Sequence, residues 1–436
     1  GLSDVTSAMQ VQRGLGSSKL AISSVGGTIN IVTRSADMKE GGSVSVGFAN
    51  DNYLKKAFSY STGVMKNGLS TSILLSQTNG DGYVDGTKFE AGNYFIGIGY
   101  KINPKHDVEF TITGAPQWHN QRSAAPTIAQ FIKYGNGEPN RRYNNDWGIL
   151  NGQEYNFRTN FYHKPIASVN WDYKINDKTK LSTVVYGSWG RGGGSNGAGA
   201  MRGNRFFSDN LRLPNGIINV DLIKAWNSGT SIVIPGTAGT STRSLVSGAY
   251  QNSSSTSNNT SNGITKIASI NSHNWYGGVV NLNTKLSERF TLDFGVDART
   301  YRGIHYQNIV DLLGSTNYAD NTDVNNANRV LTGTYAARPN LNPFFNLDYQ
   351  TAKINYNNDG LVNWYGAFTQ LEYSTEKLTA FFQGAVSNQG FRRDDYFLYL
   401  TPNPLSSTDY KNLLGGNVKG GANYNINDNH NVFVNA

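Results

Sequence analysis

The sequence predicts an all-β protein, a transmembrane antiparallel β-barrel, and three observations carry this prediction. Apolar and polar residues alternate one by one through many segments, as they do in strands whose two faces meet different surroundings. Short turns and long polar loops follow one another between these segments. No run of roughly 18 apolar residues occurs in the 436-residue chain, so a transmembrane helix is not expected.

The composition separates this chain from a disordered one. Hydrophobic residues make up 38% of the sequence and the mean hydropathy is -0.46, below the ~45–50% apolar content of soluble globular chains. Disordered chains are also poor in aromatic residues, whereas this chain has 25 Tyr, 20 Phe and 7 Trp, together with 49 Gly and 11 Pro. Such a mixture fits a barrel that faces lipid on one side and water on the other.

Cysteine content and charge exclude several kinds of function. The chain has no cysteine, which excludes disulfides, thiolate metal sites and cysteine nucleophiles. Its net charge of +8 is spread along the chain, so a nucleic-acid partner is not expected. The chain begins at Gly1 and shows no signal peptide, and we expect a mature or truncated form.

Each predicted strand has one apolar and one polar face. In the segment from residue 290, the apolar residues Phe290, Leu292, Phe294 and Val296 alternate with Asp293, Asp297 and Arg299. We expect the first set to face lipid, with Tyr94, Ile96, Ile98, Val169 and Trp171, and the second to face the lumen, with Asn170 and Lys174. About thirteen strands are predicted, several near the ~9–11 residues of a membrane strand: 41–49, 54–65, 69–78, 94–102, 108–113, 167–175, 181–189, 275–284, 290–298, 362–373, 378–387, 413–426 and 431–436.

The connections distinguish a membrane barrel from a soluble sandwich, which also alternates. Six pairs of strands are joined by short turns, of which Asn67-Gly68 is the strongest because both residues tolerate the positive φ of a type I′ turn. The others are 103–106, 176–178, 287–288, 374–376 and 427–429. The intervening stretches 79–92, 119–164, 190–272, 302–360 and 388–411 are long and polar. Outer-membrane barrels show this asymmetry, with turns on the periplasmic side and loops outside the cell.

Two stretches of the long loops have unusual compositions. Residues 247–263 form a Ser/Asn tract, which predicts a mobile segment. Residues 190–203 are rich in glycine but lack the ending of a phosphate-binding loop, which predicts a flexible loop base. The Gly-x-Ser-x-Gly match at Ser195 falls inside this stretch, without the helix that a nucleophile elbow requires.

No catalytic or metal-binding motif has the spacing that its chemistry needs. The six histidines form no i, i+4 pair and follow no zinc pattern. Residues 79–86 resemble a calcium loop, but Tyr83 stands at a ligand position and no glutamate closes the loop. The sequence therefore predicts no enzyme, no cofactor and no metal site.

One loop gathers side chains that suit ligand binding. Trp118, Trp147, Arg141 and Arg142 lie in or beside the stretch 119–164. Arginine offers a planar, permanently charged fork and tryptophan a large stacking face, so these four are the predicted ligand contacts. The alternative is that they serve the membrane girdle and loop packing.

The segment before the first strand carries a family resemblance. Val11-Gln12-Arg13-Gly14 and Gly26-Gly27-Thr28-Ile29-Asn30-Ile31-Val32-Thr33 resemble the C-terminal end of the plug domain of TonB-dependent outer-membrane receptors. The motif residues are Arg13, Gly14, Gly26, Gly27 and Asn30. The sequences of residues 23–34 and 156–165 are similar to those of receptors of Bacteroidetes-type bacteria. The plug motifs cover roughly the first tenth of the chain. The rest resembles the family only in its pattern of strands, short turns and long loops.

This resemblance implies an architecture. The family closes its barrel with about twenty-two strands around a plug, so residues 1–36 would be the end of the plug domain and 37–436 a partial barrel with long extracellular loops. The chain would then be a fragment that covers roughly the first half of the barrel.

The resemblance also implies a function and partners. The function would be energy-dependent uptake of a scarce nutrient across the bacterial outer membrane, a siderophore-like metal chelate by default. The alternatives are a passive porin or structural barrel, an oligosaccharide or cobalamin receptor, and an outer-membrane enzyme. The implied partners are the TonB–ExbB–ExbD complex, outer-membrane lipid and lipopolysaccharide, a small-molecule ligand and, as a further candidate, a surface lipoprotein.

Overall fold

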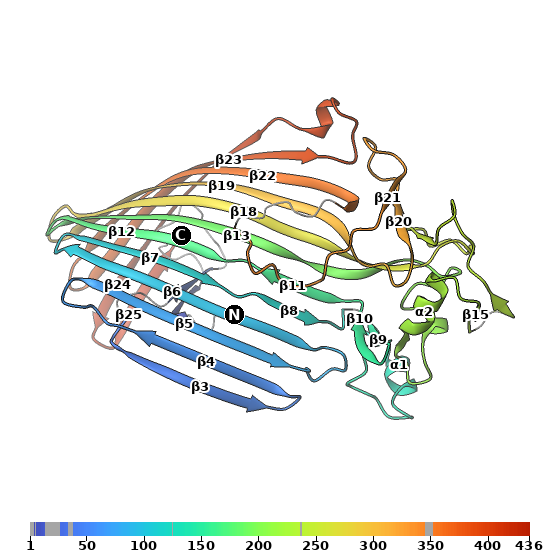
Figure 1. Cartoon of the computed structure of the whole chain (residues 1–436). Coiled ribbons are helices and arrows are strands. Elements are labelled where there is room, and N and C mark those ends of the chain that lie inside the picture. The colour runs from blue at the N-terminus through green and yellow to red at the C-terminus, as the bar shows by residue number, and fades with distance from the viewer. Residues whose placement is uncertain are drawn as a thin grey trace.

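A single curved antiparallel sheet of 15 strands dominates the computed structural model of the chain (Figure 1). The structure describes Asp4 and residues 6–13, 27–33, 38–123, 125–235, 238–344 and 352–436. In the described sheet, β3 and β25 are the two ends of the strand order and do not pair with each other. The sheet is therefore an open part of a barrel wall.

Thirteen long strands build the wall, and each contains or overlaps one of the predicted segments. They are β3 (Gly41–Ala49), β4 (Tyr53–Ser61), β5 (Leu69–Gly80), β6 (Phe89–Asn103), β7 (His106–Gly114), β12 (Ile166–Asn176), β13 (Thr179–Gly199), β18 (Ile264–Lys285), β19 (Phe290–Asp311), β22 (Lys353–Ser374), β23 (Leu378–Asp395), β24 (Lys411–Asn427) and β25 (His430–Asn435). Two short strands, β8 (Gln117–Asn120) and β11 (Thr159–His163), complete the sheet. Pro116 and Pro165 lie where β7 gives way to β8 and β11 to β12, because proline has no N–H to give to the ladder.

The remaining elements lie in the connections and in the N-terminal segment. They are β1 (Thr6–Arg13), β2 (Gly27–Thr33), β9 (Trp147–Leu150), β10 (Gln153–Asn156), β14 (Ile218–Asn219), β15 (Ile232–Val233), β16 (Thr240–Ser241), β17 (Gln251–Asn252), β20 (Asn317–Asp320), β21 (Arg329–Leu331), α1 (Ile128–Lys133), α2 (Val220–Asn227), η2 (Asp209–Leu211) and η3 (Pro404–Ser406). Among the described residues the two α-helices have six and eight residues, and no helix could span a membrane.

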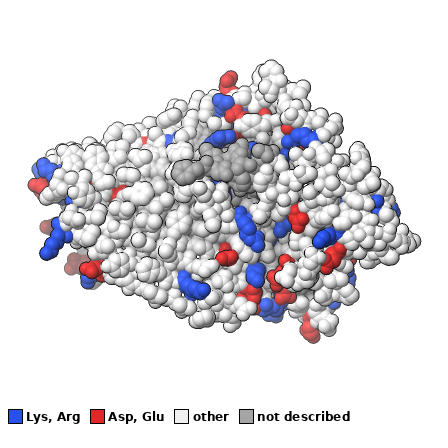
Figure 2. All heavy atoms as spheres, in the orientation of Figure 1, with Lys and Arg blue, Asp and Glu red and all other residues white. Residues whose placement is uncertain are grey.

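The two faces of the wall differ as the alternation predicts. On the convex face of β19, Phe294 is 48% exposed and Val296 44%, whereas Asp293 and Asp297 on the concave face are buried. We call the end of the wall with the β6–β7 and β12–β13 turns the short-turn end, and the opposite end, where the long loops lie, the long-loop side. Figure 2 shows a broad band with few charges between the charged groups of these two ends. The apolar side chains thus gather where a membrane would meet the wall.

Several strands are about twice as long as predicted. β18, β19 and β22 have 22 residues each, which span roughly 70 Å at about 3.3 Å per residue. The predicted loop 190–272 therefore begins and ends as strand, and so does 302–360. At the start of β18 the residues of both faces are buried from Ile264 to Ala268, so strict alternation is lost there.

The glycine-rich stretch is strand and not a flexible loop base, which corrects that prediction. β13 continues to Gly199 and pairs with β18 at residues 179–190 and 193–199. A Cβ at Gly190 would lie 2.4 Å from the His273 ring, and one at Gly197 would lie 2.4 Å from the Phe206 ring. The glycines are needed because side chains pack closely on the strand.

The Ser/Asn tract is also more structured than a mobile segment. Asn252 is buried and donates to Thr265 Oγ1 at 2.7 Å. Asn262 accepts from Ser253 N at 2.9 Å. Short polar side chains replace water as partners of the loop backbone, so this composition does not by itself indicate mobility.

The strongest predicted turn has a different geometry from the one expected. Gly68 has φ 83°, but Asn67 is not among the residues with positive φ, so Asn67-Gly68 is not a type I′ turn. Asp51 and Asn52, both with φ 56°, have the positive φ values of that turn, between β3 and β4.

Candidate functional site on the concave face

Asp4 fixes the start of the N-terminal hairpin, β1–β2, on the concave face of the wall. Its carboxylate accepts from Ser76 Oγ at 2.7 Å and Asn93 Nδ2 at 2.9 Å, and forms an ion pair with Lys55. The three partners come from neighbouring strands, β4, β5 and β6. In the described residues the hairpin is a sheet of its own, with Arg13 paired to Gly27 and Gln10 to Asn30. A separate small sheet thus begins inside the curve of the large one.

A row of aromatic side chains and one arginine lines the concave face of the central strands. We call Tyr186, Trp275, Tyr301, Arg299 and Trp364 the concave row. The Trp275 ring lies 5.9 Å from Tyr186 and 6.2 Å from Tyr301 in edge-to-face contacts. Arg299 places its guanidinium 4.9 Å from the centre of the Trp364 ring and donates to Asp297 Oδ2 at 2.6 Å.

The concave row offers stacking faces beside a fixed positive charge. This arrangement suits a ligand with flat rings or delocalised negative charge. The sequence placed Arg299 in the lumen but did not connect it to the aromatic residues. The signal was available, because Trp275, Arg299 and Tyr301 share one parity on two strands that pair directly.

The structure places Trp118 on the convex side, away from the concave row. Trp118 pairs with Glu90 of β6, which has the same parity as the convex residue Ile98. Its indole donates to Glu90 Oε2 at 3.4 Å, and the Arg338 guanidinium lies 3.8 Å from its ring centre. Trp118 also packs beside a buried cluster of convex-face and loop residues: Phe161, Ala268, Ile270, Ile304, Tyr306 and Ala337.

Arg142 and Trp147 are both engaged by the loop between β5 and β6. Arg142 donates to Asp51 at 2.9 Å and to Asp85 at 3.2 Å, and these hydrogen bonds raise the pKa of Arg142. Trp147 packs on Gly86, where a Cβ would lie 2.4 Å from the indole. Arg141 is exposed and forms no ion pair with any residue that the structure describes.

The four predicted ligand contacts do not form one cluster. Within the described chain, no hydrogen bond or ring contact joins Trp118 to Trp147 or to either arginine. Ligand binding by these residues stays a prediction, and Arg141 is the member whose guanidinium has no ion-pair partner among the described residues.

The long-loop end has a hydrophobic core of its own, which we call the cap. The core is built around η2, α2 and the ends of β13 and β18. Its buried members are Phe157, Met201, Phe206, Leu211, Ile218, Val220, Ile223, Trp226, Ile234, Ile264 and Leu313. The Trp226 indole is fully buried and donates to Asn262 O at 2.8 Å. The loops are thus packed by non-local contacts, which loop composition could not reveal.

Two buried arginines hold the backbone of the cap. Arg243 donates to Asn227 O, Gln251 O and Ser315 Oγ, each at 2.8 Å. Burial lowers the pKa of Arg243 to about 10. Arg212 donates to Gly216 O at 2.8 Å and Asn145 O at 3.0 Å. Arginine suits this position because its five donors satisfy several loop carbonyls at once.

The other motifs of the sequence form no reactive site in the described residues. Ser195 is buried and donates to Phe157 O at 2.8 Å, so the Gly-x-Ser-x-Gly match is part of strand β13. No group of three potential metal ligands comes together among the described residues. Gly14 and Gly26 of the plug motif lie outside the described residues.

Comparison with known proteins identifies the fold. No family model and no curated protein matches the sequence. The siderophore receptor PiuA from Acinetobacter baumannii matches with a TM-score of 0.58 and 12% identity, over 98% of this chain and 53% of that one. The ferripyoverdine receptor of the Pseudomonas aeruginosa outer membrane matches with a TM-score of 0.60 and 11% identity, over 99% of this chain and 46% of that one. The ferric citrate transporter FecA matches with a TM-score of 0.57 and 10% identity, over 99% of this chain and 49% of that one.

These comparisons confirm the antiparallel β-barrel fold of outer-membrane receptors. The chain spans about half the length of the receptors that it matches. The similarity to Bacteroidetes-type receptors stays a prediction.

Proposed function

We propose that this chain is part of a TonB-dependent receptor of the bacterial outer membrane that takes up a scarce nutrient by active transport. The observation that carries the proposal is the N-terminal hairpin, which Asp4 fixes on the concave face of the wall. A small sheet inside a barrel suits a plug, and a plugged lumen is typical of large outer-membrane transporters, whereas porins leave an aqueous channel. Residues 1–36 are then the end of the plug domain and 37–436 the partial barrel.

The convex face supports the location in a membrane. Its apolar side chains lie between two charged ends, and an apolar band of this kind faces lipid in outer-membrane barrels. Outer-membrane lipid and lipopolysaccharide are therefore the proposed surroundings. The short turns would lie in the periplasm, where the TonB–ExbB–ExbD complex acts, and the cap outside the cell, where a surface lipoprotein is a candidate partner.

The proposed ligand is a small metal chelate with delocalised or negative charge. The concave row supplies stacking faces and Arg299, and Arg141 supplies an exposed guanidinium near the cap. The same groups would also hold an acidic sugar or a cobalamin, which are the rival ligands. The proposed protein catalyses no covalent reaction, and the hydrogen-bonded position of Ser195 in a strand supports this part of the proposal.

An uptake experiment tests the proposal against a passive barrel. Cells producing the full-length protein are given a radiolabelled ferric chelate, with and without an uncoupler of the proton gradient. Active transport predicts that uptake stops with the uncoupler and in cells without TonB. Uptake that continues unchanged under both conditions would establish the passive barrel instead.

Protease treatment of intact cells tests the orientation. Cleavage should fall in the connections of the cap, within 121–158 and 200–263. Cleavage at the turns 103–106 and 176–179 would place the short-turn end outside and overturn the assignment.

A further inference from the structure

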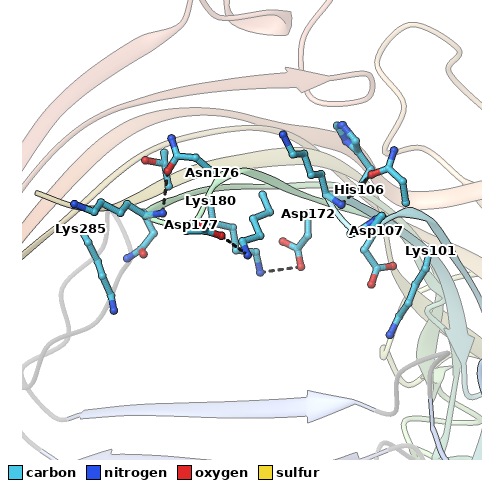
Figure 3. A pocket seen from close by; sticks show the side chains of 15 residues that line it. Lys101, His106, Asp107, Asp172, Asn176, Asp177, Lys180 and Lys285 are labelled. Carbon is cyan, nitrogen blue, oxygen red and sulfur yellow. Dashed lines mark hydrogen bonds and ion pairs between the residues drawn. The ribbon is translucent and has the colours of Figure 1, made fainter.

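The short-turn end of the wall contains a hollow lined with lysine. Its volume is about 490 Å³, and it is bounded by the β6–β7 turn, the β12–β13 turn and the end of β18. Figure 3 shows Lys101, Lys180 and Lys285 pointing to the concave side of the sheet. Strand parity agrees, because Lys101 shares its side with the buried concave residue Phe95.

The hollow carries more positive than negative charge. Its lysines are Lys101, Lys105, Lys174, Lys178, Lys180 and Lys285, and they face Asp107, Asp172 and Asp177, so six cations meet three anions. Among the described lining residues, Lys174 pairs with Asp177 at 2.8 Å and Lys180 with Asp172 at 3.0 Å. Since like charges held together repel, the surplus of positive charge favours a bound anion.

Hydrogen bonds between the turns hold the lysine backbones in place. Lys174 N donates to Lys105 O at 2.8 Å, and Lys285 N donates to Lys178 O at 2.9 Å. The Asn103 and Asn176 side chains accept from Lys105 N and Lys178 N, each at 2.9 Å. Lys101, Lys174, Lys180 and Lys285 therefore stand on strands, and Lys105 and Lys178 stand in tight turns that are hydrogen-bonded to the neighbouring strand.

We propose that this hollow, which we call the lysine hollow, binds a small polyanion that bears several carboxylates or phosphates. Its volume lies in the range of roughly 300–1,000 Å³ that small-molecule sites occupy. The inference rests on the proposed function and deepens it, because an anionic chelate that passes the plug would meet this site last, on the periplasmic side. The hollow is then a receiving site for cargo that leaves the lumen.

Calorimetry on the full-length protein in a neutral detergent tests the lysine hollow. Citrate is the probe, and glucose is the uncharged comparison. We expect citrate to bind, glucose not to bind, and the citrate affinity to fall as salt rises from low to physiological concentration. The variant Lys105→Gln/Lys178→Gln/Lys285→Gln should lose about tenfold in affinity.

A matched variant separates this site from general surface charge. Lys39→Gln/Lys66→Gln/Lys377→Gln removes three lysines that do not line the hollow, and it should bind citrate like the parent. Equal losses in the two triple variants, or no citrate binding by the parent, would overturn the inference. If the first triple variant does not fold, Lys285→Gln alone should weaken citrate binding about threefold, and no change in it would overturn the inference equally.

The outcome is independent of the transport proposal. Citrate binding in detergent needs no energy source, so it can be present where uncoupler-sensitive uptake is absent, which would reject the transport proposal alone. Energy-dependent uptake together with unaltered citrate binding in the first triple variant would reject the lysine hollow alone.

Discussion

The short-turn end and the cap are held together by different kinds of contact. At the short-turn end, tight turns join neighbouring strands, and backbone bonds such as Lys285 N to Lys178 O continue the ladder to its last residues. In the cap, segments far apart in the sequence meet around Trp226 and are held by Arg243. Backbone hydrogen bonds of the strand ladder hold the first region, and an apolar core of side chains from several loops holds the second.

This difference predicts where substitutions are costly. A side chain on the convex face of the wall points away from the protein, whereas a core side chain of the cap packs against several loops at once. The cap should therefore lose its structure as a unit when one central residue is removed, while the wall keeps its own. Four experiments, in order of expected effect on stability, test this contrast.

The largest effect is expected from Trp226→Ala in the cap core. The fully buried indole fills the centre of the core, and its removal should cost about 3–5 kcal/mol through lost burial and a cavity. Hydrogen exchange of the full-length protein should then show faster exchange across 200–263 while β22 and β23 remain protected. Leu245→Ala, at a cap side chain that is 55% exposed, is the control and should change little. Protection in the cap equal to that of the parent would contradict a shared core.

Arg243→Met should loosen the same region by a different route. The change leaves the carbonyls of Asn227 and Gln251 without their donor inside the protein, at about 1–3 kcal/mol for each buried group left unpaired. Limited proteolysis should cut faster within 238–263. The control is Arg205→Met at an exposed arginine beside Phe207. If both variants were cut at the parental rate, Arg243 would not be the central link of the cap.

Sequence reasoning predicted the wall well because alternation is a local property. Phe294 and Asp293 differ by one position and by face, and this contrast is visible without any knowledge of partners. The cap could not be predicted in the same way. Phe157, Trp226 and Ile264 stand in three separate stretches, and nothing local says that they meet. The glycines of β13 misled the prediction because glycine indicates both flexible loops and close packing.

Gly295→Ala tests close packing in the wall itself. A Cβ at Gly295 would lie 2.2 Å from Cζ of Phe368, which is buried on the concave face. Overpacking of this kind costs about 1–3 kcal/mol, so the thermal unfolding midpoint should fall. Gly360→Ala in β22 has no atom within 4 Å of its added Cβ and serves as the control. Equal midpoints for the two variants would show that Phe368 moves aside without cost.

The candidate site was predictable only in part. Residue type suggested Arg and Trp as ligand-binding groups, which stays a prediction, and parity put Arg299 on the concave face, where the structure has it. The convex position of Trp118 could not be predicted, because its short strand begins only after Pro116. The pairing of Trp118 with Glu90 places the indole on the convex face. The concave row needs the order β13-β18-β19-β22, which sequence alone did not supply.

The smallest effect on stability, and the sharpest on function, is expected from the neighbours Arg141 and Arg142. Arg142 bridges Asp51 and Asp85 but is 44% exposed, so Arg142→Ala should change stability little because solvent screens both ion pairs. Arg141→Ala removes a side chain without a described ion-pair partner and should leave stability within about 0.5 kcal/mol of the parent.

The two variants should separate in ligand binding if Arg141 meets cargo. Arg141→Ala, alone and with Trp147→Ala, should then weaken uptake of the chelate while the amount of folded barrel stays constant. Arg142→Ala should affect uptake less, because its guanidinium already has two carboxylate partners. The measurement is the ligand concentration for half-maximal uptake. The double variant Arg142→Ala/Asp85→Asn tests whether the effects of Arg142 and Asp85 on uptake depend on each other. An unchanged value in Arg141→Ala/Trp147→Ala would leave both residues with a loop-packing role and move the search for cargo contacts to the concave row.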